Sequence, residues 1–465
     1  MVAEKTEMTG KFGSAREKVV TKVKFWLLCL GVQVRIFLVG ISFLKRKSLK
    51  GLLPLLMGCF LLASADCLWA QAPDWPWTFG ETLQLTTGAD DNYSPAIASN
   101  GNLYFAVWYK KTPSGFNIYG ARIDKDGKVF DDDKGGIPIC QPPADRSWDQ
   151  IFPSVSWNGS NFFVVWQDRR SGKRWDIYGA RVAAFGRFLS VLDPEGISIS
   201  IGRSTYDQVG PSLAFDGENQ LVVWRGKRTA SAWSIYCKFV SVTNLEVIVG
   251  EDTVRVSASP KDQASPSVIF NPDAGNYFIV WQDKRGGKFW DIYGARIGSD
   301  GTPIDYPDDI LISSSGFNQW SPVLSWNEKY YLVAWAASPA GDNWNIYGKM
   351  FDSEGRPENY SDILLQGDGS SKTSPAILAG EAESFLVWEE NPKGNSNISG
   401  AVIVPDYRIF TGEAKQISDP QGMDASFPVL AKNGQDVLVV WQAKSPEGTW
   451  GIYSVPLFLA PKPGQ

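Results

Sequence analysis

A tryptophan that closes a short apolar run recurs seven times in this chain, at a spacing that barely changes. Successive copies lie 53 to 58 residues apart: Trp108, Trp166, Trp224, Trp281, Trp335, Trp388 and Trp441. A proline about a dozen residues upstream keeps the same period: Pro95, Pro153, Pro211, Pro266, Pro322, Pro375 and Pro428. A period near 50 residues with strand-like patterning is typical of propellers and strand arrays.

Each repeat has the pattern of four strands, most clearly in residues 149–182. An alternating first strand ends at Asn158-Gly159, a pair that favours a tight hairpin turn. The second strand, 162–166, is continuously apolar and therefore needs cover on both faces. A third strand follows from Trp175, and a short outer strand is expected near 197–200. The repeated tryptophans are then best explained by packing between neighbouring sheets.

Sheets that are apolar on both faces need a neighbour on each side, and a radial arrangement supplies them. We therefore expect an all-β fold, a seven-bladed β-propeller of four-stranded antiparallel blades. The seventh repeat has only three strands, whereas Thr82–Thr86 resembles an outer strand without a blade. We predict that residues 81–88 complete the last blade and close the ring. The expected blades cover about 90–141, 142–202, 203–259, 260–315, 316–368, 369–419 and 420–460.

Residues 1–70 differ in kind from the repeats and are interpreted as an N-terminal extension plus a secretory signal peptide. Lys45-Arg46-Lys47 precedes an apolar run, 52–62, and Ala70 is a suitable cleavage position. A membrane anchor is disfavoured because the run is short and contains Pro54, and a lipobox ending at Cys59 is a further alternative. We expect residues 71–465 to be secreted, periplasmic or on the cell surface, monomeric, and without a membrane span.

Composition removes several function classes. The chain has no histidine, which excludes a Ser-His-Asp triad, a histidine-ligated zinc and a histidine general base. It also has no P-loop and no dinucleotide-binding glycine motif. The acidic turns 124–127 and 352–355 lack the ligand spacing of an EF-hand. We therefore expect no cofactor and no metal. Residues 71–465 carry 34 Lys and Arg against 46 Asp and Glu, which argues against nucleic acid as a partner.

Two recurrent polar sets fall on one face of the expected ring. One lies in the connections between blades and the other in the loops between second and third strands, and such loops commonly carry binding residues. The alternative is that these side chains only brace local backbone. Glu389 and Glu390 are adjacent carboxylates on an expected loop after Trp388. Adjacent positions along a strand point apart, so the two make a poor acid/base pair, and no catalytic residue is predicted. The candidate ligand-binding residues are Trp148, Asp149, Gln150, Asp168, Arg170, Asp207, Gln208, Asp262, Gln263, Asp283, Arg285, Asn318, Gln319 and Trp320.

The string W-Q-D-x-R-x-G-x-x-W-D-I-Y-G-A-R occurs at Trp166–Arg181 and again at Trp281–Arg296. It resembles the β-propeller repeats of secreted and cell-surface proteins from bacteria and archaea, over roughly residues 81–455. That resemblance implies a binding or scaffolding role and supplies no catalytic residues. Repeats one and five to seven lack the Asp-x-Arg element.

These observations favour an exported, non-enzymatic propeller that binds a glycan, a peptide or a protein. The alternative is a carboxylate-based glycoside hydrolase or lyase on the same scaffold. Such an enzyme would show isolated acidic residues that depart from the repeat. A third possibility is a purely architectural subunit of a cell envelope.

Overall fold

The computed structural model divides the chain into two compact units, Met1–Gln71 and Ala72–Gln465. The residues that it describes are 77–459, except 132–134, 186–187, 201–205, 229–231, 243–246, 251–252, 342, 359–360, 381–382, 392–394, 404–413 and 419–422. The predicted signal peptide in residues 1–70 lies outside them and stays a prediction. No helix of the described part is long and apolar enough to cross a membrane.

Seven antiparallel sheets form the described part of the chain, and they confirm the predicted seven-bladed propeller. Blade one contains β3 (Asn92–Ser99), β4 (Tyr104–Thr112), β5 (Gly115–Ile123) and β6 (Ile137–Cys140). Blade two contains β7 (Gln150–Trp157), β8 (Phe162–Asp168), β9 (Asp176–Phe185), β10 (Phe188–Val191) and β11 (Ile197–Ser198). Blade three contains β12 (Gln208–Phe215), β13 (Asn219–Gly226), β14 (Ser234–Val242), β15 (Val247–Val249) and β16 (Val254–Arg255).

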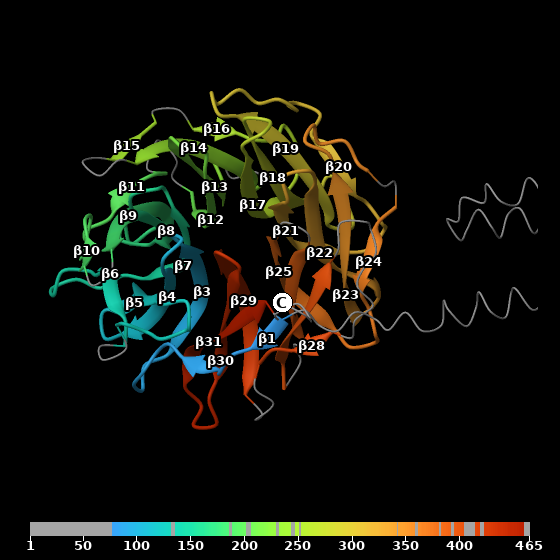
Figure 1. Ribbon diagram of the computed structural model, residues 1–465. Coiled ribbons are helices and arrows are strands. Elements are labelled where there is room, and N and C mark those ends of the chain that lie inside the picture. Colours follow the sequence, from blue (N-terminus) through green and yellow to red (C-terminus); the bar gives the residue numbers. More distant parts are fainter. Residues whose placement is uncertain are drawn as a thin grey trace, which may run out of the picture. The chain divides into compact units, whose positions relative to one another are not determined.

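The remaining blades follow the same order from the ring axis outward (Figure 1). Blade four contains β17 (Gln263–Asn271), β18 (Asn276–Asp283), β19 (Asp291–Gly298) and β20 (Ile310–Ser313). Blade five contains β21 (Gln319–Trp326), β22 (Tyr331–Ala340), β23 (Asn343–Phe351) and β24 (Ile363–Gln366). Blade six contains β25 (Lys372–Ala379), β26 (Ser384–Glu390), β27 (Asn397–Ile403) and β28 (Lys415–Gln416). Blade seven contains β29 (Asp424–Asn433), β30 (Asp436–Lys444) and β31 (Trp450–Leu459), joined by β1 (Trp77–Phe79) and β2 (Leu83–Gln84).

The second strand of each blade is buried on both faces, as its sequence predicts. Every residue of β8 and of β18 is buried. The seven repeated tryptophans lie on these strands and are less than 2% exposed. Each cluster of buried apolar side chains joins two neighbouring blades, as Phe105, Phe162 and Trp166 do between blades one and two. Packing between blades therefore holds the ring together.

The inner strands share an irregularity at the repeated proline. The pairing register of the inner and second strands shifts there, as between Ile151 and Ser154 in blade two. The residue before the proline has a positive φ in all seven blades. Glycine adopts this conformation without strain, whereas a bulky side chain rarely does. These residues are Ser94, Phe152, Gly210, Ser265, Ser321, Ser374 and Phe427.

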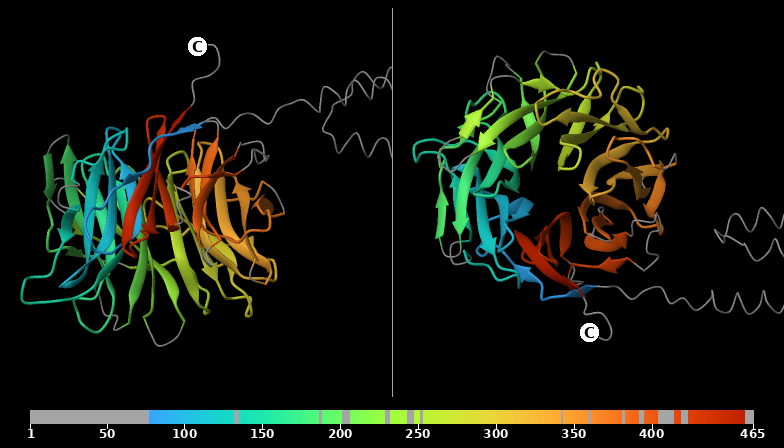
Figure 2. Two further views of the ribbon diagram at one scale, coloured as in Figure 1. Left: turned by 90° about the horizontal axis from the view of Figure 1, so that it is seen from below. Right: turned by 45° about the horizontal axis from the view of Figure 1, so that its top comes forward.

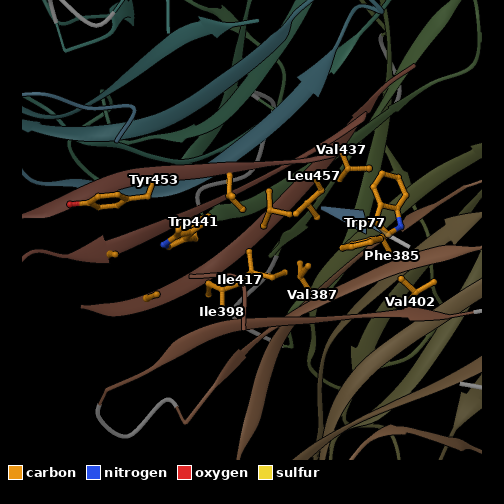
Figure 3. Close-up of a cluster of buried hydrophobic side chains, with 14 residues drawn as sticks. Trp77, Phe385, Val387, Ile398, Val402, Ile417, Val437, Trp441, Tyr453 and Leu457 are labelled. Atoms are coloured by element: carbon orange, nitrogen blue, oxygen red, sulfur yellow. The ribbon is translucent and has the colours of Figure 1, made fainter. Parts of the chain in front are cut away.

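The two ends of the described chain meet in blade seven, which confirms the predicted closure. β2 pairs with β31 through Leu83 and Ser454, and β1 extends the same edge through Trp77 and Leu459. Figure 2 shows these N-terminal strands in blue beside the red C-terminal blade. β1 was not predicted. The Trp77 ring packs edge-on against Phe385 of blade six at 5.3 Å (Figure 3).

Candidate functional site

We call one face of the ring the upper face. The inner and third strands of each blade begin there, and the second strands end there. The predicted polar sets both lie there, because each inner strand pairs in register with its second strand. Gln150 lies opposite Asp168, and Gln263 lies opposite Asp283. The structure therefore brings the two predicted sets together in blades two and four.

In blades two to five, the acidic or amide residue before the inner strand links two neighbouring blades. The Asp149 carboxylate accepts a hydrogen bond from the Phe116 backbone N–H at 3.1 Å. Equivalent bonds join Asp207 to the Trp175 N–H at 2.9 Å and Asp262 to the Trp233 N–H at 3.0 Å. Asn318 accepts from the Trp290 N–H in the same way. These side chains thus brace the seams between blades.

Asp168 and Asp283 are fully buried and bind groups of their own blade. The Asp168 carboxylate accepts from the indole N–H of Trp166 at 3.0 Å and pairs with Arg170 at 2.6 Å. Arg170 also lies over the Trp148 ring at 5.4 Å. In blade four Arg285 pairs with Asp283 at 2.7 Å and, in addition, with Asp309 at 2.6 Å.

Blade three shows why the Asp-x-Arg element is uneven. There the indole N–H of Trp224 donates to Gln208 at 2.7 Å, so a glutamine fills the place of the carboxylate. The residue opposite is Gly226, because a Cβ at that position would lie 2.1 Å from the Gln208 amide oxygen. In blade five Gln319 is fully buried and donates to Ser313 and Ser315. Internal contacts engage these predicted residues. Their binding of a ligand stays a prediction.

The position one residue after each repeated tryptophan holds an acid in one blade and an amide in three others. We did not predict this difference. In three blades a glutamine there accepts a hydrogen bond from the next inner strand, at the residue before the proline. Gln167 accepts from the Gly210 N–H at 3.0 Å, Gln282 from the Ser321 N–H at 3.2 Å and Gln442 from the Ser94 N–H at 2.7 Å.

In blade six this position is an acid, Glu389. Its side chain is 8% exposed and accepts hydrogen bonds from the Phe427 backbone N–H and from the Ser374 hydroxyl, the latter at 3.3 Å. Burial raises the pKa of Glu389, because the charged form loses hydration. Aligning the repeats at the tryptophan and comparing the residue that follows it would have identified this substitution.

Glu390, the next residue, lies in a separate set of contacts. Its carboxylate accepts from the Ser399 hydroxyl at 2.6 Å and pairs with the buried Lys372 ammonium at 3.3 Å. Burial acts to raise the pKa of Glu390, but hydrogen bonds from Ser370 and Ser399 and the charge of Lys372 hold it below its usual value. The two neighbouring glutamates therefore differ in both partners and proton affinity.

Asp424 also stands apart from its own set. It is the first residue of β29, the inner strand of blade seven, and lies four residues before the repeated proline, as Asp149, Asp207 and Asp262 do in their blades. Those three side chains each accept a backbone N–H from the preceding blade. Within the described residues, Asp424 accepts no such hydrogen bond, and its side chain is partly exposed. It lies three residues before Phe427, whose N–H binds Glu389. Both departures from the repeat thus belong to the seam between blades six and seven.

Three large apolar side chains on the inner strands are exposed rather than packed. Phe152, Trp320 and Phe427 are 43%, 42% and 49% exposed. Trp320, a predicted site residue, stacks on Trp344 at 4.5 Å. Phe152 and Phe427 occupy the positive-φ position at which four other blades have serine and one has glycine. Strain of this kind at a bulky residue points to a functional role.

The comparisons with known proteins bear on the fold. No family model matches this chain, and no curated protein does. Solved structures resemble it at low identity. A Trypanosoma rangeli sialidase bound to the inhibitor DANA is 8% identical, with a TM-score of 0.44, 68% of this chain and 56% of that chain being covered. A protein of unknown function from Dyadobacter fermentans is 11% identical, with a TM-score of 0.47 and coverages of 67% and 95%. An α-L-arabinofuranosidase from Lactobacillus brevis is 11% identical, with a TM-score of 0.35 and coverages of 52% and 89%.

One expectation is corrected here. We favoured a non-enzymatic binding or scaffolding module, but the two structures above with a stated activity are both glycosidases, and this contradicts that preference. The chain spans a little more than half the sialidase's length, and likeness at these identities shows the propeller fold alone. The activity is accordingly argued from the residues. Within the described residues, no group of His, Cys, Asp or Glu side chains is arranged to bind a metal ion.

Proposed function

We propose that this protein is a glycoside hydrolase of the carboxylate type, with its reacting groups at the seam between blades six and seven. The observation that carries the proposal is Glu389. Three other blades place a neutral glutamine at this position for the same hydrogen bond, so the fold has no need of an acid there. An acid that replaces a structural amide, and whose pKa is raised by burial, is suited to proton transfer.

In this account Glu389 donates a proton to the oxygen of the glycosidic bond that breaks. Its raised pKa keeps it protonated at a pH where an exposed glutamate has already ionised. Hydrolysis also needs a second carboxylate, which either activates water or attacks the sugar. We assign that role to Asp424, which is partly exposed and lies at the same seam.

Phe427 supplies the sugar-binding element next to the acid. Its backbone N–H binds Glu389, while its ring is 49% exposed. Aromatic rings pack against the apolar faces of sugar rings, and four other blades hold a serine at the positive-φ position that Phe427 occupies. The combination of an aromatic surface, a protonated carboxyl and a partly exposed carboxylate is what cleavage of a glycoside requires.

A panel of chromogenic glycosides tests the proposal. We expect the purified protein to hydrolyse at least one of them, and Glu389→Gln and Asp424→Asn each to reduce kcat by about 100-fold or more. Glu389→Gln restores the residue that blades two, four and seven have, so the fold should be retained.

Glu383→Gln is the matched control. Glu383 comes immediately before the first residue of β26, whereas Glu389 lies near the last. Glu383 is partly buried, and burial raises its pKa, as it does for Glu389. It accepts a hydrogen bond from Trp77 at 3.1 Å, and a glutamine can still accept that bond. Its turnover should equal that of the wild type. Absence of hydrolysis across the panel, or full activity in the folded Glu389→Gln variant, would refute the proposed function.

A further inference from the structure

A cluster of aromatic side chains covers the upper face where blades seven, one and two meet. We call it the aromatic platform, and it consists of Tyr93, Tyr109, Phe116, Phe152 and Trp450. Tyr93 stacks on Tyr109 with ring centroids 5.4 Å apart and lies 5.9 Å from Trp450. Tyr109 in turn lies 5.8 Å from Phe152. The platform is therefore a continuous aromatic surface across three blades.

The repeats show that packing alone does not require this platform. The positions equivalent to Tyr93 in the other blades hold isoleucine, valine, alanine, tryptophan, threonine and serine. Those equivalent to Tyr109 hold glutamine, arginine, alanine and glutamate. Phe152 has a φ of 52° and is 43% exposed, whereas serine takes its place in blades one, four, five and six. The exposed ring of Phe152 and the two tyrosines, which no other blade has at these positions, therefore form an apolar surface that faces solvent.

The polar groups next to Tyr93 and Tyr109 are neutral or paired. The Tyr93 hydroxyl donates to Asp91, and burial together with Asp91 raises the pKa of Tyr93 to about 12, so the phenol keeps its proton. The Ser94 hydroxyl donates to Tyr109. The nearby Lys110 is paired with Asp90 at 2.9 Å. Two exposed lysines, Lys111 and Lys444, lie opposite Phe116 and Trp450 in the strand pairing. At the centre of the platform, around Tyr93, Tyr109 and Phe152, a ligand meets aromatic faces and hydrogen-bonding oxygens.

The platform adjoins the proposed reaction site. The inner strands β29, β3 and β7 are successive neighbours around the ring (Figure 1). Phe427 and Phe152 come immediately before the repeated proline of β29 and β7, and Tyr93 lies two residues before Pro95 of β3. A single sugar ring covers about one aromatic ring, so a surface extending over three blades fits several linked sugars.

We propose that the aromatic platform binds the sugar residues of a neutral polysaccharide on one side of the bond that is cleaved. The inference rests on the proposed glycoside hydrolase function and names its substrate class, a polymer of uncharged pyranoses. The apolar faces of such sugars pack on Tyr93, Tyr109 and Phe152, and Asp91 and Ser94 lie at the platform edge within reach of hydroxyl groups.

Affinity electrophoresis in native gels tests this without any need for turnover. The gels contain hydroxyethylcellulose, arabinoxylan or, as an anionic comparison, polygalacturonate. The protein carries Glu389→Gln so that the polymer stays intact. We expect retardation by at least one of the two neutral polymers and none by polygalacturonate. Adding Phe152→Ser or Tyr93→Thr, residues that other blades have at these positions, should weaken retardation about tenfold.

Phe188→Ser is the matched control, because Phe188 is 58% exposed but lies on the outer strand β10; its retardation should not change. If neither neutral polymer retards the protein, or the folded Phe152→Ser and Tyr93→Thr variants bind as before, the platform inference is wrong. These results are independent of activity. Hydrolysis of small glycosides without polymer binding would leave the proposed function standing and refute the platform alone.

Discussion

Single residues in this chain reveal chemistry where they depart from the repeat. The glutamine after the repeated tryptophan bonds the next blade, so Glu389 at that position requires a reason other than packing. Phe152 and Phe427 likewise replace serine or glycine at a strained position. By contrast, the Asp-x-Arg residues that drew attention in the sequence are engaged in internal ion pairs. The residues that recur among the blades have structural roles, whereas the candidate site was found at residues that differ from the repeat.

The raised pKa of Glu389 gives a stability test with a definite sign. A carboxyl whose pKa is higher in the folded state stabilises the fold below its unfolded pKa, and this contribution is lost as the pH rises through the folded value. Glutamine cannot ionise. Glu389→Gln should therefore melt close to the wild type near pH 4 and above it at pH 8, as measured by thermal unfolding at both pH values. An equal difference at both pH values would contradict the assignment.

Phe152→Ser separates function from stability at the platform. Serine also has a Cβ and occupies the same positive-φ position in four other blades, so the backbone strain should change little, and loss of the ring contact with Tyr109 costs about 1 kcal/mol. The free energy of unfolding should stay within about 1 kcal/mol of the wild type, as measured by chemical denaturation. A loss of several kcal/mol would show instead that Phe152 is a packing residue.

At the scale of elements, the sequence predicted what local patterning determines. The apolar second strands, the three strands of the seventh repeat and the closing strand around residues 81–88 all followed from periodicity. The divided outer strands of blades two and three did not, nor did β1, because edge strands are short and carry little pattern. The positive φ before each proline was also missed, since serine and phenylalanine give no local signal for it.

Among the side chains of the closing segment, Leu85 should contribute most to the free energy of unfolding. Leu85 is fully buried against residues of blades one and seven, including Trp108 and Ile452. Leu85→Ala should lower the free energy of unfolding by about 2–5 kcal/mol, measured by chemical denaturation. The exposed neighbour Gln84→Ala provides the comparison and should change it by less than about 0.5 kcal/mol. A stable Leu85→Ala variant would mean that the ring does not depend on its N-terminal strand.

At the scale of the whole molecule, the ring joins residues that are distant in sequence. Glu389 and Phe427 meet across a seam, and Tyr93 and Trp450 meet because blade seven closes the ring against blade one. Sequence periodicity predicted the number of blades. It could not predict which exceptions gather on one part of the upper face, because that depends on how the closed ring orders its seams.

A crystal structure of the Glu389→Gln variant soaked with an oligosaccharide of the bound polymer would test the central claim most directly. The account predicts sugar rings on Phe427, Tyr93 and Phe152, with a glycosidic oxygen next to residue 389. Sugar bound on the opposite face, or over the Asp168 and Asp283 loops with residue 389 empty, would contradict it.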